Sequence, residues 1–328
     1  MSNKRVPDPV VPVIRGRPAR RAIGLPLLAL SLAAVVAACG TAASPTPGQT
    51  AGPTPGKTAS ATPPPSATPA ASPAIEHPTG EREVVLRFDE GGGFVPPSYF
   101  ATQVPYFSLY GDGTVIYRPA AEPALEGDMI GPLRFPPLHV ARMTEPQVQD
   151  LLQAALVDGG LAEAAPRYEN QMVADAPTAV FTVHAGGLDK TVSVYALGLE
   201  ADPGPDAAIR KQMASLGERL RAFDQEVAAG RAAEVGRYTP DRFRATLIES
   251  GGQPSQAPRP WPWPTFGPDA FVTPPDGGFP TKVLSGVEAG LVGVEEIAGG
   301  ASGIWIMSPD GRTIYELALR PLLPDEAR

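Results

Sequence analysis

The sequence predicts an α+β fold: antiparallel β-hairpins with two main packed helices, plus a smaller C-terminal α+β lobe. Alternating apolar segments joined across glycine-containing turns predict hairpins at 107–118 and 178–197. Apolar residues at helical spacing predict helices after Thr144 and after Asp206. Hairpins with separate helices are typical of α+β proteins rather than of doubly wound α/β proteins.

The first half of the folded region begins with an expected strand at 83–88. The hairpin at 107–118 turns at Gly-Asp-Gly, and residues 138–143 form a further expected strand. Thr144 then opens a helix, because Thr-Glu-Pro-Gln is a capping-box pattern with proline in the first turn. The glycine pair at 159–160 ends this helix.

The second hairpin and the long helix after it follow two different apolar periods. On the hairpin, alternate residues face inward, namely Ala179, Phe181, Val183, Val192 and Val194. The helix runs from Asp206 to about Ala229, with apolar positions spaced by four and three at Ile209, Met213, Leu216, Leu220, Phe223 and Val227. This spacing also suits a coiled-coil seam, but it covers under three heptads. We therefore expect the helix to lie on its own sheet.

The composition changes near residue 230, where we place a boundary between an α+β domain at 81–230 and a smaller lobe at 231–328. The lobe contains expected strands at 242–248 and 282–284 and a weak helix at 287–297. A last hairpin, 303–308 with 313–319, closes over Pro-Asp-Gly-Arg.

Residues 1–38 have the parts of a secretory signal peptide. The segment up to Arg21 is basic and polar, and residues 22–38 are apolar and end in small residues. A membrane-spanning helix is the rival interpretation, but at about 1.5 Å per residue this run reaches only about 25 Å, short of the about 30 Å hydrocarbon core. Arg20 and Arg21 leave twin-arginine export open, while Ala19 and Gly24 favour the general secretory route.

Val36, Ala37, Ala38 and Cys39 end the apolar run. They resemble the lipobox of bacterial lipoproteins, in which the cysteine sulfur receives a diacylglyceryl group and a peptidase cleaves just before that cysteine. The resemblance implies that Cys39 is lipidated and anchors the mature chain. Two or more acyl chains hold a protein firmly at a membrane, whereas one chain binds only marginally.

Residues 39–80 begin with this cysteine and continue as a predicted disordered tether of proline, threonine, alanine, serine and glycine. Such a segment buries too little apolar surface to offset its chain entropy. We expect a flexible spacer, and its glycosylation is left open. His77 falls within the predicted tether, so we do not expect it to belong to a fixed metal site.

Charge and cysteine content exclude several classes of function. The formal net charge is −8 and becomes about −13 without residues 1–38, which hold six basic residues and one acidic residue. A chain this acidic is a poor ligand for nucleic acid. Cys39 is the only cysteine, so a lipidated chain has no thiol for a nucleophile, a cysteine zinc site or an iron–sulfur cluster. We expect no cofactor.

Five segments resemble an uncharacterised family of bacterial lipoproteins from high-GC Gram-positive and related bacteria. The segments are 93–97 (GFVPP), 109–115 (LYGDGTV), 175–178 (DAPT), 192–198 (VSVYALG) and 320–324 (RPLLP). They are spread over most of residues 83–328. The resemblance implies a shared fold and export, and it implies no particular activity.

Catalytic and metal motifs are weak in this sequence. His139 and His184 are the histidines of the predicted folded region, and no spacing around them favours a metal site, so none is expected. The glycine run at 91–93 is not followed by a helix, so we expect a turn or bulge rather than a phosphate loop. Ser302 lacks the final glycine of a Gly-x-Ser-x-Gly nucleophile elbow.

Trp261, Trp263 and Phe266 in the segment WPWPTF are the candidate ligand-binding residues. Rigid aromatic side chains in a proline-rich loop can stack on a sugar or grip a peptide. Such loops more often fold their rings against the domain as a lid on the core. We favour the lid and leave the binding surface open.

These observations predict a lipid-anchored protein on the extracytoplasmic face of the cell membrane, with a non-catalytic binding or envelope-organising domain. The expected partners are the membrane, through the anchor, and a glycan, a peptide or an envelope protein, but not nucleic acid. The alternative is an extracytoplasmic hydrolase with a site assembled from dispersed residues. A third interpretation is a partner-dependent subunit that pairs through the helix at 206–229.

The anchor yields the first testable prediction. Replacing the acylated residue, Cys39→Ala, removes the acceptor sulfur, so the chain should leave the membrane fraction or stay unprocessed. Membrane fractionation with mass measurement of the product checks this. A correctly processed variant that remained membrane-bound would refute lipidation at Cys39.

Overall fold

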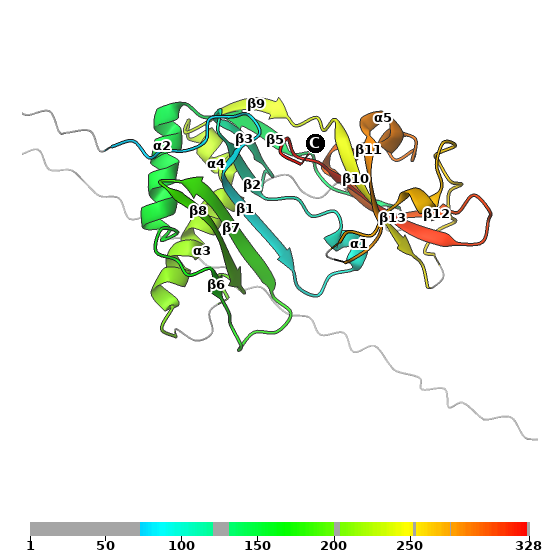
Figure 1. Cartoon of the computed structure of the whole chain (residues 1–328), viewed down its shortest axis with the longest axis horizontal. Coiled ribbons are helices and arrows are strands. Elements are labelled where there is room, and N and C mark those ends of the chain that lie inside the picture. The colour runs from blue at the N-terminus through cyan, green and yellow to red at the C-terminus, as the bar shows by residue number, and fades with distance from the viewer. Residues whose placement is uncertain (1–72, 121–130, 200–203, 252–253, 276, 327–328) are drawn as a thin grey trace, which may run out of the picture. The chain divides into compact units, whose positions relative to one another are not determined.

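The computed structural model describes residues 73–120, 131–199, 204–251, 254–275 and 277–326. All of them belong to one compact unit, residues 69–328. The predicted signal peptide, the lipobox-like motif with Cys39 and most of the predicted tether lie outside the described residues. Two mostly antiparallel sheets with separate helices confirm the predicted α+β class (Figure 1).

The larger sheet has eight strands in the order β6-β8-β7-β1-β2-β3-β5-β9. Neighbouring strands are antiparallel except for the short parallel pair β6–β8. The predicted strands at 83–88, 107–118, 138–143 and 178–197 all form here. The bounds are β1 Val84–Gly92, β2 Phe107–Tyr110, β3 Thr114–Tyr117, β5 His139–Arg142, β6 Arg167–Tyr168, β7 Pro177–Ala185, β8 Leu188–Tyr195 and β9 Ala233–Arg237.

The smaller sheet has five strands in the order β11-β10-β13-β12-β4, all antiparallel. Its strands are β4 Leu133–Arg134, β10 Arg242–Glu249, β11 Thr281–Ser285, β12 Ala301–Met307 and β13 Ile314–Pro321. The expected helix at 287–297 is shorter than predicted, since only α5, Gly286–Gly290, and a 3-10 turn, Ile297–Gly299, form. A second 3-10 turn, Pro268–Ala270, precedes β11.

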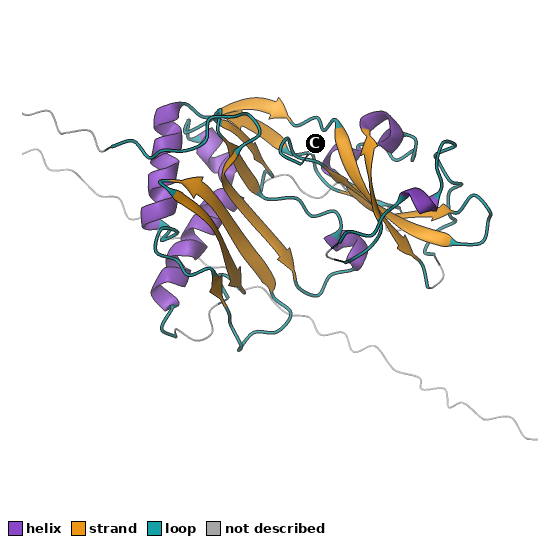
Figure 2. Ribbon diagram, viewed as in Figure 1, coloured by secondary structure: helices purple, strands orange, loops and turns teal. Residues whose placement is uncertain are grey.

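Helices cover one face of the larger sheet (Figure 2). They are α2 Glu145–Gln153, continued by a π-helical turn at Ala154–Asp158, then α3 Ala207–Arg221 and α4 Phe223–Ala228. The predicted single helix at 206–229 is therefore broken at Ala222. All six predicted apolar positions pack in or against the core of this sheet, which confirms a helix on its own sheet. The coiled-coil interpretation was wrong, because its seam is already covered.

The local signals for α2 and for the second hairpin are also confirmed. The backbone N–H of Thr144 donates to the Gln147 side chain at 2.8 Å, which closes half of the capping box. The five residues predicted to face inward on the hairpin are all fully buried. Gly186 and Gly187 make its turn with φ of 61° and 74°, a conformation that favours glycine.

The predicted tether ends earlier than residue 80. Ile75 packs against the helix-covered core, and its backbone N–H donates to Gln149 Oε1 at 2.7 Å. The Glu76 carbonyl accepts from Gly186 N–H at 2.8 Å, and His77 contacts Glu145. Residues 75–77 are therefore part of the folded unit, and assigning them to a disordered tether was wrong.

The predicted boundary at 230/231 does not coincide with the two sheets. Strand β9 follows residue 230 but pairs with β5 at the edge of the larger sheet. Strand β4 precedes residue 230 but pairs with β12 in the smaller sheet. The division into an 81–230 domain and a 231–328 lobe stays a prediction, and two strand pairings cross it.

The segment after β13 joins the two sheets. The Asp325 carboxylate accepts from both terminal nitrogens of Arg87 on β1, at 2.8 and 3.1 Å, and from the Tyr110 hydroxyl at 2.8 Å. Leu323 packs with Val104 and Tyr110, among other residues, on the face of the larger sheet that the helices leave free. We call Leu322–Glu326 with these partners the C-terminal clamp.

In the C-terminal clamp, pairing with Arg87 keeps the Asp325 carboxylate ionised, and burial keeps the Tyr110 hydroxyl protonated. Burial alone would raise the pKa of Asp325, but hydrogen bonds and charge from Arg87, with the Tyr110 hydroxyl, hold it below its ordinary value. Burial raises the pKa of Tyr110, so its hydroxyl stays protonated and donates. Asp325 therefore stabilises the fold above its unfolded-state pKa of about 3.9, and this contribution is lost as the pH falls through the lower folded-state value.

The clamp yields a prediction on stability. Asp325→Asn should lower the free energy of unfolding by about 2 kcal/mol at pH 7, the size expected for hydrogen bonds to a charged group. The difference from wild type should shrink as the pH falls through the lowered pKa of Asp325, where the wild-type side chain also becomes neutral. Urea denaturation over this pH range checks both. Asp150→Asn, an exposed carboxylate on α2, is the control, and a loss independent of pH would contradict the assignment.

Candidate functional site

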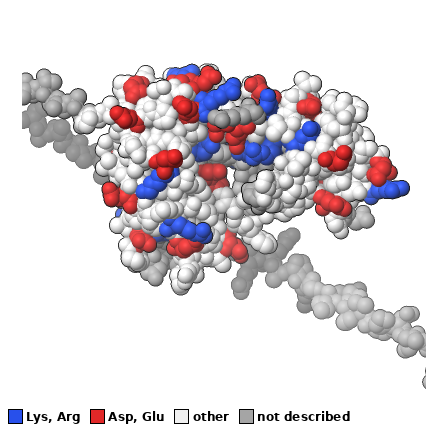
Figure 3. All heavy atoms as spheres, in the orientation of Figure 1, with Lys and Arg blue, Asp and Glu red and all other residues white. Residues whose placement is uncertain are grey.

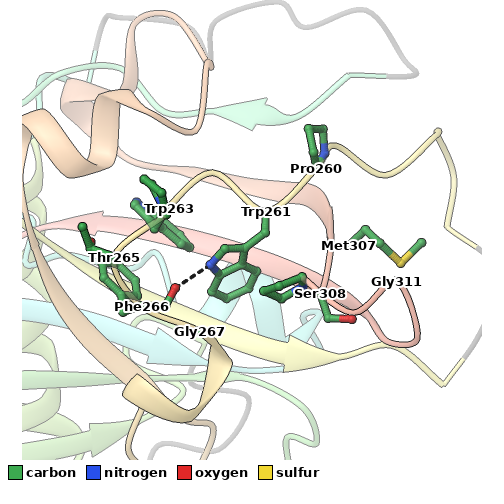
Figure 4. Close-up of a pocket in the computed structure, with 11 residues that line it drawn as sticks. Pro260, Trp261, Trp263, Thr265, Phe266, Gly267, Met307, Ser308 and Gly311 are labelled. Atoms are coloured by element: carbon green, nitrogen blue, oxygen red, sulfur yellow. Dashed lines mark hydrogen bonds between the residues drawn. The ribbon is translucent and has the colours of Figure 1, made fainter.

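The predicted aromatic residues lie in the long connection between β10 and β11. Arg259, just before them, is pinned beside β12: its N–H donates to the Trp305 carbonyl and its carbonyl accepts from Met307 N–H, both at 2.8 Å. This pairing brings the loop next to the turn between β12 and β13. Figure 4 shows the rings of Trp261, Trp263 and Phe266 gathered there.

Trp263 is a core residue. Its side chain is only 1% exposed, and it belongs to the core of the smaller sheet. Its indole N–H donates to the Glu288 carbonyl at 2.9 Å, and its ring stacks on Phe266 with centroids 5.2 Å apart. These contacts match the favoured interpretation of the loop as a lid on the core.

Trp261 and Phe266 are partly exposed and line a groove. The Trp261 indole N–H donates to the Phe266 carbonyl at 2.7 Å, so the loop closes on itself (Figure 4). The groove has a volume of about 720 Å³, and its other wall is the turn that includes Met307 and Ser308. The Ser308 hydroxyl donates to Asp310 and accepts from Thr313 N–H. Both indole N–H groups and this hydroxyl are therefore already bonded within the protein.

A second hollow, which sequence reasoning missed, lies between the two sheets. This polar crevice has a volume of about 580 Å³. One wall is the helix-free face of β1 and β7, where Asp89 and Gly91 lie opposite Val180 and Thr178. The other wall is β10 and β13. One side is closed by the end of helix α1, which spans Pro97–Phe100, and by the residues that follow it. Its lining residues are Asp89, Gly91, Gly92, Phe100, Ala101, Gln103, Thr178, Val180, Arg244, Thr246 and Arg320.

Two arginines stand side by side in this crevice but differ in their bonding. Arg320 donates to both carboxylate oxygens of Glu326, at 2.8 and 3.1 Å, and to the Gln103 carbonyl at 2.6 Å. Arg244 is its direct neighbour across the β10–β13 ladder. The Arg244 guanidinium makes no hydrogen bond or ion pair with any other described residue, so its charge is available to a ligand.

The crevice also contains uncommitted neutral polar groups. Thr246 is only 5% exposed, yet its hydroxyl makes no hydrogen bond within the described part of the chain. The Thr178 hydroxyl and the Gln103 carboxamide, on half-buried residues, likewise make no hydrogen bond with any other described residue. Polar side-chain groups that line a crevice and have no such bond are candidates for ligand contacts.

The glycine run at 91–93 helps to shape the crevice. We expected a turn or bulge at the run, and Gly91 and Gly92 instead continue β1, which ends at Gly92. A Cβ added at Gly91 would lie 2.8 Å from Gln103 Oε1 and 3.9 Å from the Phe100 ring. Glycine at this position lets both side chains approach the strand. The run was a visible sequence signal, but nothing local indicates what would pack against it.

The histidines do not meet at a common site. His139 Nδ1 lies 3.1 Å from Glu234 Oε1, and His184 Nδ1 lies 3.0 Å from Asp189 Oδ1. Neither histidine lines the aromatic groove or the polar crevice. The described residues contain no cluster of three or more histidine, cysteine or acidic side chains that could hold a metal ion.

Charges on the surface are mixed in sign. On the face in view in Figure 3, acidic and basic side chains are interspersed, and no broad basic surface stands out. Within the described part of the chain, no helix is long and apolar enough to cross a bilayer.

Comparison with known proteins adds no assignment. No protein-family model, no curated protein and no solved structure matches the chain. The resemblance to an uncharacterised lipoprotein family therefore stays a prediction, and the site must be interpreted from its own geometry.

The aromatic loop yields a prediction on stability. Trp263→Ala should cost about 4 kcal/mol, because it empties a core position and removes the indole hydrogen bond to the Glu288 carbonyl. Trp261→Ala should cost about half as much, since that ring is partly exposed. Urea denaturation measures both, with Trp305→Ala on β12 as the control outside the groove. Equal losses at 261 and 263 would contradict the distinction between core and groove.

Proposed function

We propose that this chain is a lipid-anchored extracytoplasmic binding protein that holds a small anionic ligand in the polar crevice. The lipobox-like motif ending in Cys39 and the proline-rich segment after it support anchoring at a distance from the membrane. The observation that carries the binding role is the uncommitted guanidinium of Arg244 beside the unbonded hydroxyl of Thr246.

The crevice suits binding better than the aromatic groove does. A volume of about 580 Å³ falls within the usual range for small-molecule sites, about 300–1,000 Å³. Several polar side chains of the crevice make no hydrogen bond with other described residues, whereas both indole N–H groups of the aromatic groove donate to backbone carbonyls. A ligand in the crevice would gain hydrogen bonds without breaking any within the protein, which favours affinity.

The arginine pair explains why the ligand should be an anion. Arg244 and Arg320 face each other directly across two strands, and like charges in such a register are unfavourable. Glu326 offsets Arg320, which leaves Arg244 without a counter-charge in bonding distance. An anionic ligand supplies that counter-charge.

The hydrolase remains the alternative candidate, with a distinct signature. It would convert its ligand rather than release it unchanged. No histidine lines the crevice, so a hydrolytic reaction there would depend on Asp89 as its acid–base group. Mass analysis of the recovered ligand distinguishes the two functions.

Arg244 yields a prediction without any ligand. Arg244→Thr should leave the melting temperature unchanged or raise it, because the side chain has no bond to lose and its like-charged neighbour is relieved. Arg320→Ala should lower it by several degrees, since it leaves Glu326 unpaired. Thermal denaturation of both variants checks this. A large loss of stability in Arg244→Thr would mean that Arg244 is a structural residue.

Ligand-induced stabilisation tests the function itself. Propionate and citrate at about 20 mM should raise the melting temperature of the wild type, by an amount that grows with the logarithm of ligand concentration over Kd, and should not raise that of Arg244→Thr. Choline, a cation, should move neither. Arg312→Ala removes an exposed arginine that does not line the crevice and should behave as wild type. If neither anion shifts the wild type, the crevice is not a site for small anions.

A further inference from the structure

The polar crevice contains the groups that recognise an acidic sugar. We propose that its ligand is a hexuronic acid or a short oligosaccharide of one, a class that combines a carboxylate, several hydroxyls and a ring. This inference rests on the proposed function and narrows it. Three parts of the crevice, each from a different element, match the three parts of such a ligand.

The carboxylate would bind at Arg244. A guanidinium binds a carboxylate through two parallel N–H···O bonds, and that fork is free here. The neighbouring Arg320 cannot offer the same fork, because both of its terminal nitrogens are bonded to Glu326. Because Glu326 offsets Arg320, Arg244 is the lining cation left for a ligand, and it makes no bond with the Asp89 carboxylate, which favours an anion over a neutral sugar.

The hydroxyls would bind on both walls. Thr246 on β10 and Thr178 on β7 each offer a hydroxyl, and Gln103 offers a carboxamide, none of them bonded to another side chain among the described residues. Asp89 on β1 accepts the backbone N–H of Glu90 at one oxygen and has capacity for a ligand hydroxyl. A simple carboxylate would leave most of these groups unbonded, at a cost in affinity.

The ring would stack on Phe100. This side chain is 55% exposed, lines the crevice and lies 3.9 Å from the position of a Cβ on Gly91. An exposed aromatic face beside hydrogen-bonding groups suits a sugar ring, which has apolar C–H faces and a polar rim. The aromatic groove at Trp261 also offers ring faces, but the indole N–H groups of its tryptophans are already bonded. Its tryptophans therefore provide no free donor for the polar rim of a sugar.

The test compares three probes on the purified full chain: D-glucuronate, D-glucose, which lacks the carboxylate, and propionate, which lacks the hydroxyls and the ring. Saturation-transfer NMR with competition gives their relative affinities. We expect glucuronate to bind at least about ten-fold more tightly than either other probe. A difference of this size is what one good hydrogen bond to a charged group contributes. Glucose and propionate should both be displaced by glucuronate.

Two variants separate the parts of the recognition. Arg244→Thr should remove the preference for glucuronate over glucose. Thr246→Val keeps the volume of the side chain and should reduce the preference over propionate by several-fold, with Thr191→Val on the surface of β8 as its matched control. Melting temperatures near that of the wild type confirm that these variants are folded.

The outcomes distinguish this inference from the proposed function. If propionate binds as tightly as glucuronate in an Arg244-dependent manner, the acidic-sugar assignment is overturned and a simple anion site stands. If glucose binds as tightly as glucuronate, the role of Arg244 in selecting the ligand is refuted. If no probe binds in an Arg244-dependent manner, both the inference and the proposed function fail.

Discussion

The ion pair between Arg87 and Asp325 is the contact on which the arrangement of the two sheets depends. Arg87 is on β1 of the larger sheet, whereas Asp325 follows β13 of the smaller one. Residues of a strand that are two apart face the same side, so Arg87 and Asp89 lie on one face, with Asp89 further along in the crevice. The clamp thus holds the two polar faces at a set distance, together with the bond from Arg320 to the Gln103 carbonyl.

The same clamp explains why the crevice keeps unbonded groups. A purely apolar contact between the sheets would close until every gap was filled, because protein interiors are close-packed. Here charged side chains line the space, and Arg320 is held by Glu326 and by the Gln103 carbonyl. The groups bonded within the protein stabilise the structure, and the groups left over, Arg244 and Thr246, are those assigned to the ligand.

Most of the fold could be predicted from local patterns, and the site could not. The alternation of Phe181 and Val183 and the helical spacing around Met213 each describe one element and its buried face. Strand β9 was missed because its sequence, AEVGR, lies exposed at a sheet edge and shows no apolar alternation.

In β10 the polar residues Arg244 and Thr246 alternate with the buried Phe243, Ala245 and Leu247. That alternation predicts a polar face but not the sheet opposite it, whose residues come from distant parts of the chain. Conversely, WPWPTF was conspicuous in sequence and proved mainly to supply core.

The proposed binding role requires that the Arg244 guanidinium is uncommitted until a ligand arrives, and side-chain NMR measures this. The Nε–H resonances of Arg87, Arg320 and Arg244 report how fast each exchanges with water. We expect slow exchange for Arg87 and Arg320 and fast exchange for Arg244 in the free protein, with Arg244 alone becoming protected when D-glucuronate is added. Protection of Arg244 in the free protein, or no change on adding the ligand, would contradict the claim.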